Sequence, residues 1–66
     1  MNIQKVEQRR KDKGISVQHM AETLGMDAST YYRKLQKNGE EFSALDLTVF
    51  KRELDLTEQE ALDFLL

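Results

Sequence analysis

The chain has 66 residues, a length that forms one small domain and leaves no room for a second core or a deep enclosed substrate cavity. Cysteine is absent and histidine occurs once, which excludes disulfide frameworks, thiolate metal sites and multi-histidine metal clusters. The net charge of −2 conceals an asymmetry: residues 1–38 hold eight Lys or Arg against four Asp or Glu, whereas residues 39–66 hold two against eight. Because counterion release depends on where charges lie, the basic half remains suited to a phosphate backbone.

Composition favours a helical protein. Proline is missing and the β-branched residues are scattered, which predicts an all-α fold. No apolar run approaches the ~20 residues that cross a bilayer, and the first residues are polar where a signal peptide would be apolar. We therefore expect a soluble, cytoplasmic protein with no membrane partner.

The first predicted helix covers residues 2–13, between the N-cap residue Asn2 and a left-handed stop at Gly14. The run of charged residues at 9–13 is mostly basic and predicts an exposed helix face that also favours the negative end of the helix dipole. Arg10 is the exception within this run. We expect its stem to be packed and its head to be paired with an acid.

Two short helices follow, at residues 17–24 and 28–37, and only Gly25, Met26 and Asp27 separate them. Both helices are too short to be stable alone, so packing must hold them. A tight turn with a glycine between two such helices is typical of a helix-turn-helix, in which the second helix projects outward to enter a major groove. Here the glycine ends one helix, the methionine fills the elbow and the aspartate caps the next helix.

The last two helices are predicted at residues 44–54 and 58–65, and each starts with an N-cap residue followed by an acid three positions later. These starts pair Ser43 with Asp46 and Thr57 with Glu60.

Three adjacent apolar residues end the chain: Phe64, Leu65 and Leu66. They cannot all face one core from one helical turn. We expect a two-fold partner to cover them in a homodimer on DNA, although local core packing or fraying would also account for them.

Residues 16–35, SVQHMAETLGMDASTYYRKL, resemble the helix-turn-helix of the phage repressor and Cro family, the lambda-repressor-like domains also called the XRE type. The matched features are Arg10 four residues before Gly14, the caps Ser16 and Asp27, the small residue Ala21, Leu24, Gly25, Met26 and the buried position Tyr31. The later helices are also similar, so the resemblance covers nearly the whole chain. One departure is Val17, which stands where the family commonly has glutamine.

The resemblance implies a compact five-helix lambda-repressor-like domain, with the second and third helices as the helix-turn-helix. It implies a nucleoid-associated transcriptional regulator that acts by occupying a double-stranded DNA operator, with no cofactor and no catalysis. An enzyme is not expected on chemical grounds either, because the chain lacks a Gly-rich phosphate loop, paired carboxylates at a plausible cleft and a suitable Ser–His pairing.

Carried over by position, the resemblance assigns base contacts to Ala28, Ser29, Tyr32 and Arg33. Helical spacing favours the same side, because it lies opposite the apolar stripe of Tyr31 and Leu35. The arginine suits the O6 and N7 atoms of guanine, the serine can donate or accept, and the alanine methyl suits a thymine methyl. Without a paired Asn or Gln, this side should read adenine poorly by direct contact.

Contacts to the sugar-phosphate backbone are expected on both flanks of this side. One set follows the recognition helix and comprises Thr30, Lys34, Gln36, Lys37 and Asn38. A second anion site combines Ser16 and Gln18 with the free amides at the start of the preceding helix.

Several alternatives stay open at this stage. Tyr32 either stacks on the DNA backbone or shares the core with Tyr31, and Arg33 is either a base reader or a solvated charge. The acidic second half is either a solvated face that orients the protein on DNA or a docking surface. The rival function is a helical protein-interaction module, such as an adaptor, antitoxin or anti-repressor, that uses the acidic half or the apolar C-terminus.

Overall fold

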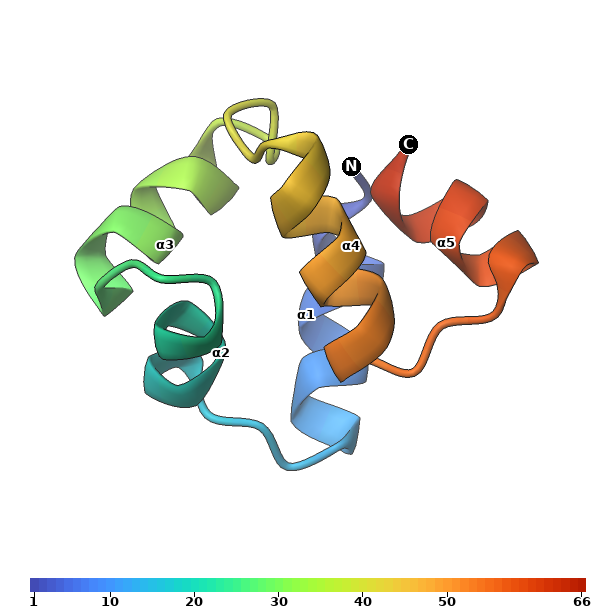
Figure 1. The fold of residues 1–66 in the computed structure, drawn as a ribbon, viewed down its shortest axis with the longest axis horizontal. Coiled ribbons are helices and arrows are strands. Elements are labelled where there is room, and N and C mark those ends of the chain that lie inside the picture. Colours follow the sequence, from blue (N-terminus) through green and yellow to red (C-terminus); the bar gives the residue numbers. More distant parts are fainter.

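Each helix begins at a residue whose side-chain oxygen accepts a hydrogen bond from the backbone N–H three residues further on. The computed structural model describes residues 1–66, and Figure 1 shows helices joined by short turns, with no strand. The helices are α1 (Ile3–Asp12), α2 (Val17–Thr23), α3 (Ala28–Gln36), α4 (Ala44–Glu53) and α5 (Glu58–Leu65). The all-α fold class and the five-helix order are thus confirmed.

The helix bounds differ from the predicted ones by at most one residue at each end. The differences arise because the predicted ranges included cap residues, which lie just outside the helices. The cap residues concerned are Asn2, Lys13, Leu24, Lys37 and Leu54. Both predicted capping boxes are present, with Ser43 paired to Asp46 and Thr57 to Glu60. Local capping chemistry therefore sets where the elements begin and end.

Residues in the left-handed region stop the first four helices. The three glycines that the sequence marks as stops all have positive φ, but at the end of α3 the first left-handed residue is Asn38, with φ of 58°, and Gly39 follows it. After α4 the sequence has no glycine, and Asp55 takes the left-handed conformation instead, with φ of 53°. A short polar side chain tolerates this region better than most, so Asp55 can end α4 without a glycine.

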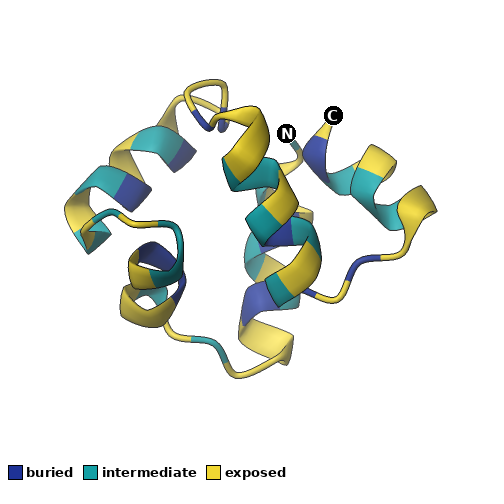
Figure 2. Ribbon diagram, viewed as in Figure 1, coloured by how far each residue is buried: buried dark blue, intermediate teal, exposed yellow.

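The core is shared by all five helices and by the turns before and after α4. Its buried apolar residues are Val6, Met20, Ala21, Tyr31, Leu35, Phe42, Phe50, Leu54, Leu56 and Leu65. Three aromatic rings pack within it, with ring centroids 6.1 Å apart for Tyr31 and Phe42 and 5.0 Å apart for Phe42 and Phe50. Figure 2 shows the buried segments turned toward the interior of the bundle.

The helices are arranged around α1 and α4 (Figure 1). α2 and α3 pack against each other on one flank, and α5 packs along α1 on the other. The N–H of Asn2 donates to the carbonyl oxygen of Phe64 at 2.8 Å, which joins the two ends of the chain. No helix has both the length and the apolar character that a membrane span requires.

Arg10 is buried and structural, as the sequence predicts. Its Nε donates to Oε2 of Glu7 at 2.9 Å, and its Nη1 donates to the carbonyl oxygen of Ile15 at 2.7 Å. The Tyr31 hydroxyl donates to the same Glu7 oxygen at 2.9 Å. This network ties α1 to α3 and to the segment before α2. The hydrogen bond that the Arg10 guanidinium donates to Glu7 raises the pKa of Arg10. Burial raises the pKa of the Tyr31 hydroxyl.

Candidate nucleic-acid interface

The turn between α2 and α3 fixes how α3 leaves the body of the protein. Gly25, with φ of 77°, donates its N–H to the carbonyl oxygen of Glu22 at 2.9 Å, and Met26 donates to that of Ala21 at 3.0 Å. These are the two hydrogen bonds of a Schellman motif, which satisfies the last carbonyls of α2. Ala21 is fully buried where the helices meet, and Met26 packs against the core. Gly25 thus ends α2 and Met26 fills the elbow, as predicted, and Asp27 caps α3.

α3 has a buried side and an exposed side, with several residues at the boundary between them. Tyr31 and Leu35 are in the core, whereas Ser29, Tyr32 and Arg33 are exposed. Tyr32 lies at the boundary: half of its surface is exposed, and its ring meets the Tyr31 ring edge-on with centroids 6.3 Å apart. It is therefore neither a core residue nor fully free. Ala28 is partly buried at the first position of the helix.

The hydroxyl of Ser29 is already engaged. It donates to Oδ1 of Asp27 at 2.8 Å, and the same oxygen accepts the N–H of Thr30 at 2.8 Å. The backbone hydrogen bond from Thr30, followed by that from Ser29, lowers the pKa of Asp27. In this arrangement the serine offers lone pairs rather than its hydrogen to a base edge. The sequence correctly predicted Asp27 as the cap of α3, but it did not indicate that the Asp27 carboxylate would also accept the hydroxyl hydrogen of Ser29.

The cations that follow along α3 also have partners within the chain. Arg33 Nη1 lies 3.4 Å from Oε1 of Glu41, and Lys37 Nζ lies 3.0 Å from its Oε2. Lys34 Nζ sits 5.7 Å from the centroid of the Phe42 ring. Sequence reasoning missed Glu41. It lies four residues after Lys37, but that spacing signals contact only within a helix, and α3 ends at Gln36.

The remaining backbone-contact candidates lie on the surface or at its edge. Ser16, Gln18, Gln36 and Asn38 are exposed, and Thr30 is partly buried. The Ser16 oxygen accepts the N–H of His19 at 3.0 Å and so caps α2. Gln18 Nε2 donates to Oε1 of Glu22 at 3.3 Å, which places a carboxylate beside the expected second anion site.

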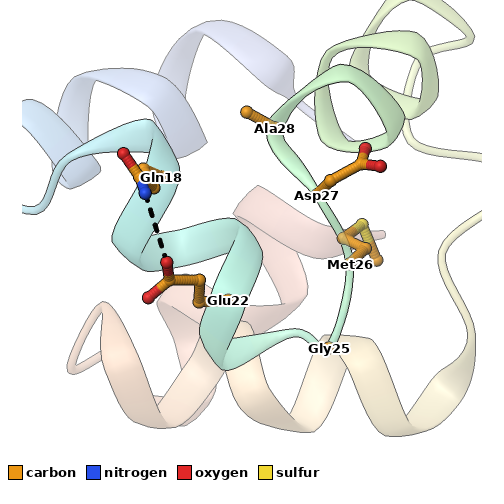
Figure 3. A pocket seen from close by; sticks show the side chains of 6 residues that line it. All are labelled: Gln18, Glu22, Gly25, Met26, Asp27 and Ala28. Carbon is orange, nitrogen blue, oxygen red and sulfur yellow. Dashed lines mark hydrogen bonds between the residues drawn. The ribbon is translucent and has the colours of Figure 1, made fainter.

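A hollow separates α2 from the start of α3. Its lining residues are Gln18, Glu22, Gly25, Met26, Asp27 and Ala28. Figure 3 shows the Gln18–Glu22 pair on the α2 wall and Asp27 and Ala28 on the opposite wall. Two carboxylates thus border the hollow. Its walls favour a neutral or donor-bearing group over a phosphate.

The C-terminal apolar residues differ from expectation. Leu65 is buried in the core of its own chain, and the ring of Phe64 is flanked by Lys5 Nζ at 5.7 Å and Arg9 Cζ at 5.3 Å. Of the alternatives that the sequence left open for these three residues, local core packing thus holds for Leu65, because α5 packs against α1. Only Leu66 remains largely exposed, at 77% of its surface.

Part of the charge difference between the two halves of the chain is neutralised by ion pairs within the molecule. Side chains of α1 form ion pairs with acids of α5, namely Lys5 with Asp63 and Arg9 with Glu60. On α4, Lys51 pairs with Glu58. Several acids of the second half thus pair with cations of α1 and α4, and Glu41 does the same for Arg33 and Lys37.

Comparisons with other proteins supply no relative. No protein-family model matches the chain, and neither the curated proteins nor the solved structures gave a match. The resemblance to lambda-repressor-like domains accordingly rests on the chain's own residues.

Proposed function

We propose that the protein is a sequence-specific, double-stranded DNA-binding transcriptional regulator of the Cro or repressor type, as found in phages. It would occupy an operator by inserting α3 into the major groove. The observation that carries the proposal is the division of α3, which anchors Tyr31 and Leu35 in the core and leaves Ser29, Tyr32 and Arg33 exposed on the other side.

The chemistry of the exposed side supports this function. α3 carries Arg33 and Lys34, Lys37 caps its end, and the helix itself contains no acid. Arginine forks onto guanine, and the lysines suit phosphates on either side of the groove. Because Ser29 already donates to Asp27, its lone pairs suit the amino group of cytosine or adenine.

Binding would regulate by occupancy, since a protein seated in the groove blocks access to the same DNA. A homodimer would place two α3 helices on half-sites about 34 Å apart. In such a dimer, Leu66 and Phe64 would contribute to the interface, whereas Leu65 is committed to its own core.

The decisive experiment combines salt titration with selection. Binding to a labelled random duplex, followed by fluorescence anisotropy between 50 and 200 mM NaCl, should weaken steeply, with a log–log slope near −0.9 for each phosphate neutralised. Selection of bound sites from random duplexes should then recover a defined sequence. A flat salt response together with no enriched site would refute the proposal.

A protein-interaction module is the second candidate, and three exposed leucines favour it. Leu45 on α4, Leu62 on α5 and the C-terminal Leu66 are 74%, 56% and 77% exposed. Such a module would ignore duplex DNA at all salt concentrations and would change its size in chromatography only when its protein partner is present. The anisotropy measurement therefore separates the two candidates.

A further inference from the structure

The turn that follows α3 places an acidic residue, Glu41, against the cations at the end of this helix. Glu41 makes ion pairs with both Lys37, at 3.0 Å, and Arg33, at 3.4 Å. Its neighbour Glu40 is exposed and makes no ion pair. One carboxylate thus bridges a residue proposed to read a base and a residue proposed to hold the DNA backbone.

The position of Glu41 is fixed by tertiary structure. Gly39 is buried with φ of 72°, and its N–H donates to the carbonyl oxygen of Lys34 at 2.9 Å. Phe42 is in the core, and its N–H donates to the carbonyl oxygen of Gly39 at 3.2 Å. Since anchored residues stand on both sides of it, Glu41 has little freedom to move its backbone away from α3.

A carboxylate and a phosphate compete for the same donors. Both present anionic oxygens to guanidinium and ammonium groups, with similar charge-assisted geometry. The hydrogen bond from Lys37 and the positive field of Arg33 and Lys34 lower the pKa of Glu41. The group is therefore ionised at neutral pH and remains a competing anion there.

We propose that Glu41 is an internal competitor for DNA. In the free protein its carboxylate occupies the place on Lys37 that a backbone phosphate takes in the complex, and the place on Arg33 that a base edge takes. This inference rests on the proposed DNA-binding function. Docking of α3 must first break both ion pairs, so the affinity for any duplex is lower than the cations alone would give. The acid thereby limits binding to DNA of unrelated sequence.

The test compares Glu41→Gln with Glu40→Gln, which removes the same charge from the adjacent exposed position. Affinity for a random duplex is measured by anisotropy from 50 to 200 mM NaCl. We expect Glu41→Gln to bind about three- to tenfold more tightly, as loss of two exposed ion pairs implies. Its log–log salt slope should stay close to that of the unaltered protein, because the same cations neutralise the same phosphates in both complexes. Glu40→Gln should change affinity by less than about twofold, through screened long-range charge alone.

The outcomes separate this inference from the function on which it rests. Equal effects of the two substitutions, or weaker binding by Glu41→Gln, would overturn the competitor role and leave DNA binding intact. If none of the three proteins binds duplex, the proposed function fails and the competitor role fails with it.

A measurement on the unaltered protein covers the case in which Glu41→Gln does not fold. The pKa of the Glu41 carboxyl, followed by carbon NMR, should rise when duplex is added, because the DNA takes over its cations and the phosphates face the carboxylate with like charge. A pKa that stays at its free-protein value in the complex would overturn the proposal.

Discussion

Arg33 is the exposed side chain of α3 whose chemistry best matches a base edge. We expect Arg33→Ala to cost about 1–3 kcal/mol of binding free energy, concentrated at one base pair of the selected site. Arg52→Ala serves as the control, because Arg52 is also exposed but lies on α4. Competition binding against single-base variants of the site measures both. A uniform loss across all sequences would reassign Arg33 to the backbone.

Tyr31 and Tyr32 are adjacent in the sequence but differ in what their hydroxyls do. The Tyr31 hydroxyl donates to the partly buried carboxylate of Glu7, which also accepts from Arg10. Tyr31→Phe should therefore lower the free energy of unfolding by about 1.5–3 kcal/mol, the range for a hydrogen bond to a charged group. Tyr32→Phe should change it little. Urea unfolding of the two variants gives the comparison, and equal losses would contradict the network described above.

At the scale of elements, two glycine stops share a conformation but not an environment. Gly14 and Gly39 both have positive φ, yet a Cβ at position 14 meets open space, whereas one at position 39 would lie 2.7 Å from Met1 Sδ. Gly14→Ala should cost about 1–2 kcal/mol of stability from the backbone alone. Gly39→Ala should cost more, by an amount that depends on how far the Met1 side chain can move. Thermal or urea unfolding ranks the pair, and the opposite order would show that Met1 moves aside freely.

The helix-turn-helix is the element that the sequence predicted most completely. Its caps and its glycine stop are signals within a few residues, so local hydrogen bonding decides them. The left-handed stops at Asn38 and Asp55 were missed because residues other than glycine take that conformation there. The two capping boxes that start α4 and α5 were found because each is a motif of four consecutive residues.

At the scale of the whole molecule, acid should destabilise the fold. Hydrogen bonds and ion pairs lower the pKa of Asp27, Glu41 and Glu60 in the folded state. A lowered folded-state pKa contributes stability above the unfolded-state value, near 4, and that contribution is lost as pH falls through the folded-state value. We therefore expect the urea midpoint to be flat from pH 7 to 5 and to fall below pH 4.5.

The matched variant for this pH profile is Glu60→Gln, which removes a carboxylate that caps α5 and pairs with Arg9. Its stability should fall less steeply between pH 5 and pH 2 than that of the unaltered protein. An unchanged profile would mean that other carboxylates dominate acid unfolding.

The sequence by itself determined the class of fold, the helix order, the helix ends and the two-sided character of α3. These depend on residues within one or two turns of each other, where spacing along the chain fixes proximity in space. Even the buried Arg10 could be assigned a structural role on this basis.

Only the tertiary structure decided how distant charges and apolar residues meet. It buried Leu65 beside α1, paired α1 cations with α5 acids, and placed Glu41 against Lys37 and Arg33. Whole-chain charge could not reveal which cations remain available to DNA, because each pairing depends on the angle at which separate helices pack. That angle is set by the shape of the shared core, and no short stretch of the sequence determines it.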